Sequence, residues 1–249
     1  MLFRSRSCER TLEDGWRLHA QSRGKPQELL CRALVVAVGR FGCSLVPMGP
    51  RTFLDRLIGV VGFVQDAGNG DDRTLIEACE TGWWYCASLP RGRQVAAFMT
   101  DADLTETDRG RLDDIWQNAL QRSIHARARV CGKTLLGPQE VVSASTYHRT
   151  RVAGERWVVA GDATFTFDPL SSQGIHKAVA SGVAAAEVIA SSITGAQDTL
   201  VEYANDAKRA FASYLEARAE YYRREARWPR SAFWRRRQFG QAMHPMTPG

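Results

Sequence analysis

The residues best suited to chemistry lie in one stretch, GDATFTFDPLSSQGIHKAV, which begins at Gly161. The carboxylate of Asp162 follows an apolar run that reads as a buried strand, and Pro169 and Gly174 then break the chain before a helical pattern. A short carboxylate at a strand end can accept hydrogen bonds from ligand hydroxyls, and free N–H groups at a helix start attract negative charge. The spacing therefore predicts a ligand site near Asp162. The alternative is that Asp162 only caps the following turn.

A strand and a helix must position this corner. After Gly174, apolar residues recur at helical spacing and small residues fill the positions between them. The apolar positions are Ile175, Val179, Val183, Ala186 and Ile189, and the small ones are Ala178, Ala180, Ser181, Gly182, Ala184 and Ala185. So thin a helix allows a large flat ligand, or another backbone, to come close. A second apolar run, LVVAVGR at 34–40, is typical of a buried parallel strand and also ends in a glycine corner.

The segments between these two strands indicate an antiparallel sheet. Strands are expected at 57–64, 74–79, 83–89, 94–100 and 141–147, most of them bounded by glycine-containing turns. A helix is expected from Thr105 to about Ala126, with Thr107 and Asp108 as caps, and a hairpin-like excursion at 16–22 and 28–36. This order of elements predicts a two-domain α/β protein.

Three aromatic residues follow one another on the strand at 83–89. Because successive side chains alternate across a strand, Trp83 and Tyr85 face one side and Trp84 the other. One of these sides faces a substrate cavity in the functional interpretation. In the structural interpretation all three belong to the sheet core.

Composition excludes several classes of protein. The chain has 249 residues, 44% of them hydrophobic and 24% charged, as in ordinary globular proteins. Its longest apolar run, LIGVVGFV at 57–64, is far shorter than the roughly 20 residues of a membrane helix, and the start has no apolar signal-peptide core. The six cysteines form no C-x-x-C pair, and the five histidines show no metal-ligand spacing. We therefore expect a cytoplasmic protein with reduced thiols, no metal site and no membrane contact.

The net charge of +6 is uneven, because arginines crowd into the tail together with aromatic residues. A basic surface with aromatics is one signature of nucleic-acid binding. Helical spacing favours a different interpretation, in which the aromatics form the inner stripe of a docked helix and the arginines its solvated face. The stripe consists of Leu200, Tyr203, Ala207, Phe211, Tyr214, Arg218 and Tyr221. We therefore expect no nucleic-acid partner.

The stretch GDATFTFDPLSSQGIHKAV resembles the second flavin-binding motif of FAD-dependent aromatic hydroxylases. Its DPLSSQG segment is more similar to the tryptophan-halogenase-like branch, and within that to the flavoproteins that modify residues of enzymes with peptide-derived quinone cofactors. The stretches LVVAVGR, TGWWYCASLP, VAAFMTDADL and YYRREARWPRSAFWRRR also resemble this family. The resemblance extends from about Leu12 to Arg237.

The resemblance implies FAD as the cofactor and assigns roles at the corner. Asp162 would accept hydrogen bonds from the ribityl hydroxyls, and Gly161 would let the backbone approach the cofactor. The residues expected around the isoalloxazine ring are Pro169, Ser171, Ser172, Gln173, Gly174 and Ile175. The N–H groups at the helix start would face the N1–C2=O edge, where reduced flavin gathers charge. No catalytic side chain is named, because the cofactor carries most of the chemistry.

By the same resemblance, the protein is a monooxygenase-like oxidoreductase that hydroxylates an aromatic substrate, either tryptophan-like or bound in a peptide. The electrons would come from NAD(P)H or a flavin reductase, and Trp83, Trp84 and Tyr85 would contact the substrate. The expected fold is a partial Rossmann-like FAD-binding domain interrupted by an antiparallel substrate domain. The expected segments are 1–45 for the remnant of the FAD-binding domain, 46–147 for the substrate domain, 148–195 for the segment with the Gly-Asp motif, and 196–249 for C-terminal helices.

The sequence departs from the family pattern in three places. It contains no G-x-G-x-x-G, the loop that holds the FAD pyrophosphate in the family. Val36 stands where the family has an acidic residue, and the halogenase signature W-x-W-x-I-P is not met after Trp83. A truncated remnant without catalysis, or one half of a split enzyme, is therefore the main alternative function, with weak FAD binding and poor solubility expected of the chain alone. A flavin-dependent halogenase is a lesser alternative.

Overall fold

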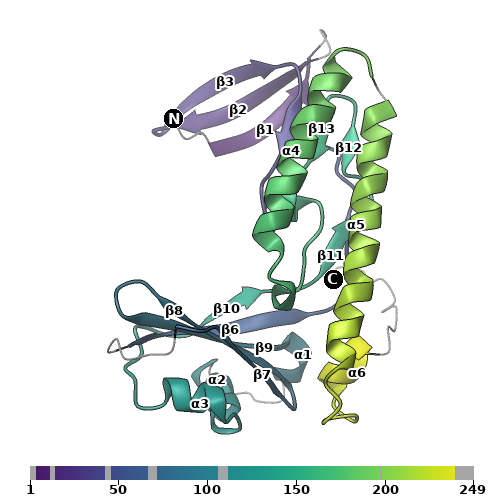
Figure 1. The fold of residues 1–249 in the computed structure, drawn as a ribbon. Helices are drawn as coiled ribbons and strands as arrows, with labels where there is room; N and C mark the ends of the chain where they lie inside the picture. Colours follow the sequence, from purple (N-terminus) through teal and green to yellow (C-terminus); the bar gives the residue numbers. More distant parts are fainter. Residues whose placement is uncertain are drawn as a thin grey trace. The chain divides into compact units, whose positions relative to one another are not determined.

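The computed structural model describes residues 4–11, 15–42, 46–66, 72–105, 112–196 and 198–238 (Figure 1). The chain divides into two units. The first unit contains residues 1–52 and 147–215, and the second contains residues 53–146 and 216–249. The segment boundaries expected from the sequence stay predictions. The two units group residues 198–215 with the first and 216–238 with the second, so the tail is shared between them.

The first unit begins with an antiparallel three-stranded sheet in the order β1-β2-β3. Its strands are β1 (Arg4–Arg10), β2 (Trp16–Ser22) and β3 (Lys25–Cys31). Arg23 and Gly24 connect β2 to β3, and both have positive φ, 51° and 79°. Positive φ at both central residues matches the twist of a two-residue hairpin. The predicted hairpin-like excursion is therefore confirmed, although the run at 28–36 is divided between β3 and the next strand.

A small mixed sheet carries the two apolar runs, in the order β12-β13-β4. Strand β4 (Leu34–Val36) pairs in parallel with β13 (Trp157–Val159), and β12 (Ala153–Gly154) pairs antiparallel with β13. The side chains of Val36, Val158 and Val159 are buried in the core of this unit. The parallel strand expected in the run at 34–40 is confirmed, and the structure shows that its partner is the strand before Asp162. Two further short strands, β5 (Arg51–Phe53) and β11 (Tyr147–Arg149), pair with each other.

The helix predicted after Gly174 is α4 (Gly174–Ile193), which contacts β4 and β13. Figure 1 shows it in green beside β13. Ala185 is fully buried on its inner side, while Ile175, Val179 and Val183 are exposed. The apolar stripe read from the sequence therefore faces solvent in its first half. Two short 3₁₀ segments, η1 (Gly161–Ala163) and η2 (Pro169–Ser171), connect β13 to α4.

Helix α5 (Asp198–Arg223) carries the predicted aromatic stripe. The buried positions Leu200, Tyr203, Phe211 and Tyr214 confirm the inner face of its first-unit part. The last position is wrong, because Tyr221 is 58% exposed and Tyr222 is buried instead. The reason is tertiary. The final turns belong to the second unit, and the Tyr222 hydroxyl there accepts a hydrogen bond from the Trp83 indole N–H at 3.2 Å.

The second unit contains a five-stranded antiparallel sheet in the order β10-β6-β9-β8-β7. Its strands are β6 (Leu57–Gln65), β7 (Leu75–Cys79), β8 (Gly82–Leu89), β9 (Arg93–Asp101) and β10 (Glu140–Ser143). The four predicted strands between 57 and 100 are confirmed. The strand predicted at 141–147 is instead two strands, because pairing with β6 stops at Ser143 and Tyr147 begins β11 in the first unit.

The single helix predicted from Thr105 to Ala126 is wrong. The structure has α1 (Ala102–Thr105), α2 (Leu112–Gln121) and α3 (His125–Val130), and the predicted caps Thr107 and Asp108 lie outside the described residues. The Glu77 carboxylate of β7 accepts hydrogen bonds from the N–H groups of Ile124 and Ala126, both at 2.7 Å. A carboxylate at this position favours the start of a new helix. Figure 1 shows α2 and α3 on one face of the sheet.

A last short helix, α6 (Ala232–Gln238), completes the second unit. Its Phe233 and Trp234 side chains are buried, and the Trp234 indole N–H donates to the Cys79 carbonyl at 2.8 Å. This contact anchors α6 at the end of the edge strand β7. Among the helices in the described ranges, none is both long enough and apolar enough to cross a bilayer.

Candidate functional site

The candidate site is the corner where β13 ends. Gly161 has a φ of 64°, a left-handed conformation that strains residues with a side chain. Its N–H donates to the Ser181 hydroxyl of α4 at 2.9 Å, and a Cβ built on Gly161 would lie 3.7 Å from Cβ of Ala178. The corner can rest on the helix at this distance because Ala178 and Ser181 are small. The structure therefore confirms that another backbone segment, at Gly161, comes close to the thin helix.

Asp162 is held by a lysine of the same helix. The Lys177 Nζ lies 2.7 Å from Oδ1 of Asp162 and also donates to the Phe165 carbonyl at 2.5 Å. The Lys177 side chain is 8% exposed, whereas the Asp162 side chain is 36% exposed. The ammonium also lies 4.8 Å from the ring centroids of both Phe165 and Phe167. Lys177 thus orients one oxygen of the Asp162 carboxylate, and the carboxylate remains partly accessible to solvent.

Burial lowers the pKa of Lys177, and the hydrogen bond to Asp162 opposes this shift. A buried ammonium is costly unless it is paired, so Asp162, the Phe165 carbonyl and the two rings together compensate its desolvation. The Lys177–Asp162 pair is therefore part of the structure of the corner. Removing either side chain changes the environment of the other.

Two more side chains hold the backbone of the corner. The Tyr147 hydroxyl donates to the Asp162 carbonyl at 2.6 Å and lies 3.5 Å from the Arg40 carbonyl. Arg149 donates from Nε to the Ala163 carbonyl at 3.0 Å. Burial raises the pKa of Tyr147 and lowers that of Arg149. Because Arg40 follows β4 and Asp162 follows β13, Tyr147 connects the ends of the two parallel strands.

The loop between the corner and α4 is also ordered by its own side chains. The buried Asp168 carboxylate caps η2 by accepting a hydrogen bond from the Leu170 N–H at 3.0 Å. The backbone N–H of Asp168 donates to the Tyr214 hydroxyl oxygen at 2.7 Å. Ser172 has a left-handed φ of 53°. The first backbone bond of α4 runs from the Lys177 N–H to the Gln173 carbonyl at 2.9 Å. The N–H groups of residues 174–176 therefore precede the helical ladder and are available to a ligand.

The exposure of the predicted cofactor residues fits a binding surface. Gly161, Asp162 and Ser171 are half-buried, and the others are exposed, with Ile175 at 84%. The exposed ones are Pro169, Ser172, Gln173, Gly174 and Ile175. The structure brings Gly161 and Asp162 together with α4 through Ser181 and Lys177. Their contact with a cofactor stays a prediction.

The three predicted substrate residues lie on β8 in the second unit. Trp83 and Trp84 are 2% and 0% exposed, so both indoles are core residues. Trp84 packs edge-on against Trp116, with ring centroids 5.5 Å apart. Tyr85 is half-buried, and it is the one of the three with appreciable accessible surface. A substrate role for this strand stays a prediction and depends mainly on Tyr85.

Sequence reasoning missed three residues of the corner, Tyr147, Arg149 and Lys177, and it treated Ser181 only as a small residue of the helix. For Lys177 a signal was present, because it is the only formally charged residue between Asp168 and Glu187. A lone lysine in a segment of small and apolar residues indicates either an exposed charge or a buried, paired one. Tyr147 and Arg149 carry no such local signal, since they reach the corner from a strand that is distant in sequence.

Sequence comparison finds a relative that matches most of the chain. LodB of Marinomonas mediterranea, named as an FAD-dependent oxidoreductase, is 30% identical over 214 residues, which is 85% of this chain and 57% of LodB. The chain thus spans a little over half the length of this relative. The flavin-dependent halogenase armH1 of Armillaria mellea is 48% identical over 50 residues, 20% of this chain and 10% of armH1. No protein-family model matches the chain.

Solved structures share the fold. The myxobacterial chondrochloren halogenase CndH superposes with a TM-score of 0.81 at 18% identity, covering 95% of this chain and 57% of CndH. The flavin-dependent halogenase CmlS gives 0.77 at 21%, covering 90% and 43%. The peptidyl tryptophan dihydroxylase QhpG gives 0.75 at 22%, covering 97% and 55%. The predicted fold class, an α/β flavoprotein domain combined with an antiparallel sheet, is confirmed.

The chain is thus similar in sequence to an FAD-dependent oxidoreductase and shares its fold with FAD-dependent, halogenase-like flavoproteins. The predicted family resemblance is therefore confirmed. LodB is named as dependent on FAD, and CmlS and armH1 are named as dependent on flavin.

Proposed function

We propose that this chain binds FAD at the Asp162 corner and serves in the oxidation of an aromatic substrate. The observation that carries the proposal is the corner itself. A carboxylate that is one-third exposed lies at the end of a parallel strand, against a thin helix whose first N–H groups are open. Ligands of open α/β sheets bind outside the carboxyl ends of the strands, which is where Asp162 and Arg40 lie.

The residues present fit such a cofactor. Lys177 engages only Oδ1 of Asp162 among the described contacts, so the carboxylate retains acceptor capacity for ribityl hydroxyls. A Cβ built on Gly174 would meet no atom within 4 Å, so the start of α4 is uncrowded. The N–H groups of residues 174–176 and the positive end of the helix dipole favour an electron-rich ring edge at this place.

When bound, FAD supplies the redox and oxygen chemistry. The chain's own residues bind and orient it. Lys177 fixes the direction of the Asp162 carboxylate, while Tyr147 and Arg149 hold the carbonyls of the corner and prevent its rotation. Phe165 and Phe167 keep the ammonium of Lys177 away from water. These contacts preorganise the corner, which reduces the entropic cost of binding.

The proposed substrate is an aromatic group, either tryptophan-like or bound in a peptide. The support is the similarity to QhpG, which is named as a peptidyl tryptophan dihydroxylase, and to LodB. The proposed reaction is hydroxylation, with NAD(P)H or a flavin reductase as the source of electrons. The proposed compartment is the cytoplasm.

Halogenation is the second candidate reaction. Its support is the fold shared with CndH and CmlS and the short stretch 48% identical to armH1. Product analysis by mass spectrometry, with and without bromide and at equal ionic strength, separates the two reactions. Addition of oxygen that is independent of bromide supports hydroxylation, and bromide-dependent addition of bromine supports halogenation.

Titration with FAD tests the corner directly. We expect Asp162→Ala to weaken binding by about 1.5–3 kcal/mol, the range for a hydrogen bond to a charged group. Quenching of flavin fluorescence measures the affinity, for the chain alone and with a G-x-G-x-x-G unit of the family added in trans. Glu187→Gln is the matched control, because Glu187 is an exposed acidic residue further along α4. Equal affinity of the folded Asp162→Ala variant and the wild type would contradict the proposal.

A further inference from the structure

The loop between the Asp162 corner and α4 is held by a residue of a distant helix. Tyr214 lies on α5 and is 7% exposed, and its hydroxyl oxygen accepts a hydrogen bond from the backbone N–H of Asp168 at 2.7 Å. Both residues belong to the first unit. A buried backbone donor is costly to leave without an acceptor, so this bond holds the loop at its first residue.

The position of Asp168 in turn directs the rest of the loop. Its carboxylate accepts a hydrogen bond from the Leu170 N–H at 3.0 Å and so caps η2. The segment η2 ends at Ser172, which has a left-handed φ of 53°, and Gln173 then precedes the first residue of α4. The direction of the first N–H groups of α4 therefore depends on where Asp168 is held.

The ring of Tyr214 contacts a second part of the site. It stacks on Phe167, with the ring centroids 4.1 Å apart and an angle of 25° between the planes. Phe167 also lies against the ammonium of Lys177, which is 4.8 Å from its ring centroid, and Lys177 pairs with Asp162. Tyr214 thus holds the loop through its hydroxyl and supports the packing of the corner through its ring.

We propose that Tyr214 is a positioning residue of the flavin site, which sets the direction of the N–H groups of residues 174–176 through the loop that it holds. The inference rests on the proposed function, because these groups act on the chemistry only when a flavin meets them. Donors that are fixed in direction stabilise the charge that reduced flavin gathers at its N1–C2=O edge. Tyr214 therefore tunes the reduction potential of bound flavin through the loop.

Tyr203 provides a matched comparison on the same helix. Its side chain is also 7% exposed, and its hydroxyl donates to the Val159 carbonyl at 2.8 Å in the core of the first unit. The Thr164 hydroxyl donates to the same carbonyl at 2.8 Å, so this acceptor keeps a donor when the Tyr203 hydroxyl is removed. Each tyrosine thus supplies one buried hydrogen bond, but of the two only Tyr214 bonds to the loop.

The variants Tyr214→Phe and Tyr203→Phe, made in the full chain, test the inference first without cofactor. Amide hydrogen exchange followed by mass spectrometry reports the opening of the loop at residues 168–173. We expect exchange there to be about threefold to tenfold faster in Tyr214→Phe than in the wild type, the scale of one lost hydrogen bond. Tyr203→Phe should leave the exchange of this loop unchanged.

The second measurement is made with FAD bound, in the presence of a G-x-G-x-x-G unit of the family in trans. We expect a more negative reduction potential and an altered flavin absorbance spectrum in Tyr214→Phe, because the donors at the ring edge are less well directed. FAD affinity should fall by less than about tenfold, since the contacts of the Asp162 corner remain. Tyr203→Phe should keep the potential and the spectrum of the wild type.

Phe167→Leu keeps the Tyr214 hydroxyl and removes the stacked ring, so it keeps the inference testable if Tyr214→Phe does not fold. We expect it to weaken FAD binding, and unchanged affinity would overturn the role of the ring. An unchanged potential in folded Tyr214→Phe, or an equal shift in Tyr203→Phe, would overturn the positioning role while leaving flavin binding at Asp162 intact. Failure of the wild type to bind FAD would instead overturn the proposed function, and this inference with it.

Discussion

Two ion-paired regions of this molecule use charge in opposite ways. At the Asp162 corner of the first unit, a single buried lysine pairs with a carboxylate that is 36% exposed. In the second unit, Asp101 and Arg237 form a pair in which both side chains are 1% exposed, and Arg236 joins them. The corner thus has its negative group toward solvent, whereas the pair of the second unit is buried on both sides.

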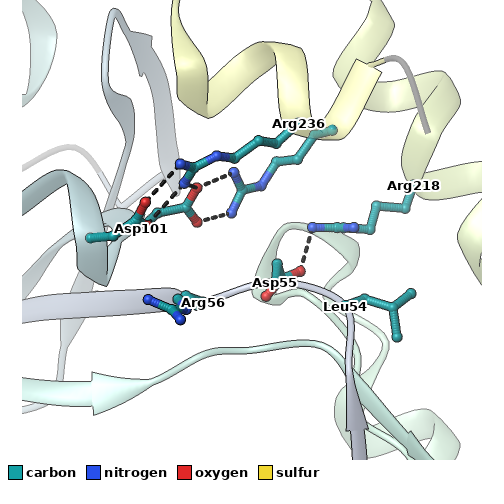
Figure 2. A pocket seen from close by; sticks show the side chains of 8 residues that line it. Leu54, Asp55, Arg56, Asp101, Arg218 and Arg236 are labelled. Carbon is teal, nitrogen blue, oxygen red and sulfur yellow. Dashed lines mark hydrogen bonds and ion pairs between the residues drawn. The ribbon is translucent and has the colours of Figure 1, made fainter. Parts of the chain in front are cut away.

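The two regions differ in how much hydrogen-bond acceptor capacity each carboxylate retains. Asp162 is engaged through Oδ1 by Lys177 and remains partly exposed, so it can still accept from a ligand. Asp101 accepts on both oxygens from guanidinium groups (Figure 2), and its side chain is almost fully buried. A pair with one solvent-facing carboxylate can still serve binding, while a pair that is buried on both sides is the costlier one to break. Five predictions test or extend this comparison.

The largest effect is expected at the buried pair. Asp101→Asn removes the charge between Arg236 and Arg237 and leaves a buried guanidinium uncompensated. We expect a loss of about 3–5 kcal/mol in the free energy of unfolding, measured by denaturant titration. The double variant Asp101→Leu with Arg237→Met should recover part of this loss, because it removes both charges. A loss below about 1 kcal/mol for Asp101→Asn would show that the pair is hydrated in solution.

A smaller effect is expected at the corner. Lys177→Met removes the ammonium, leaving the Phe165 carbonyl without its donor and Asp162 partly in water. We expect a loss of about 1–3 kcal/mol, together with weaker FAD binding. Lys208→Met, an exposed lysine on α5, is the control and should leave both quantities unchanged. An equal loss in Lys177→Met and Asp101→Asn would contradict the contrast between the two regions.

Lys177 also has a pH signature. Burial lowers its pKa below the usual 10.5, so the unfolded chain binds this proton more tightly than the folded one. The contribution of Lys177 to the free energy of unfolding therefore rises as pH increases from the lowered pKa toward 10.5. Comparing the pH profiles of the wild type and Lys177→Met isolates the contribution. A wild-type profile that falls relative to the variant over this window would show the opposite shift.

The buried thiol of Cys79 in the second unit should make stability fall at high pH, which is opposite to the effect of Lys177. Burial raises the pKa of Cys79 from 9.0 to about 12, with Glu77 adding to the shift. The folded state then retains a proton that the unfolded chain loses above pH 9, so stability falls as pH rises toward 12. By pH 10 the loss is on the order of 1 kcal/mol. Unfolding of Cys79→Ala between pH 8 and 10 should show a flatter slope than the wild type, whatever its stability at pH 8.

The smallest effect is expected at an exposed pair. Arg223 and Glu220 lie 3.0 Å apart on α5, with side chains 57% and 56% exposed. Arg223→Gln should change the free energy of unfolding by less than about 0.5 kcal/mol, and added salt should make the variant and the wild type indistinguishable. A loss comparable to that of Lys177→Met would mean that exposure does not separate structural from solvated pairs in this chain.

Local patterns predicted most of the sheets and the thin helix correctly. Alternating and apolar runs located β6 to β9, and the β-branched runs around Val35 and Val158 located β4 and β13, whose pairing only the structure shows. The helix expected at 105–126 was wrong because the Glu77 carboxylate, distant in sequence, begins α3 at His125. Tyr221 was chosen over Tyr222 because helical spacing does not show which neighbour the last turn meets.

The sequence by itself determined the character of the corner: a strand, Gly161, Asp162 and a helix of small residues, because each is encoded by neighbouring residue types. It also contained the lone charge of Lys177 without showing its partner. Only the tertiary structure decided that Lys177 is buried against Asp162 and that Tyr147 joins the two strand ends. The physical reason is that burial and pairing depend on which distant segments meet, and the energy of a charge depends on that environment more than on its neighbours in the chain.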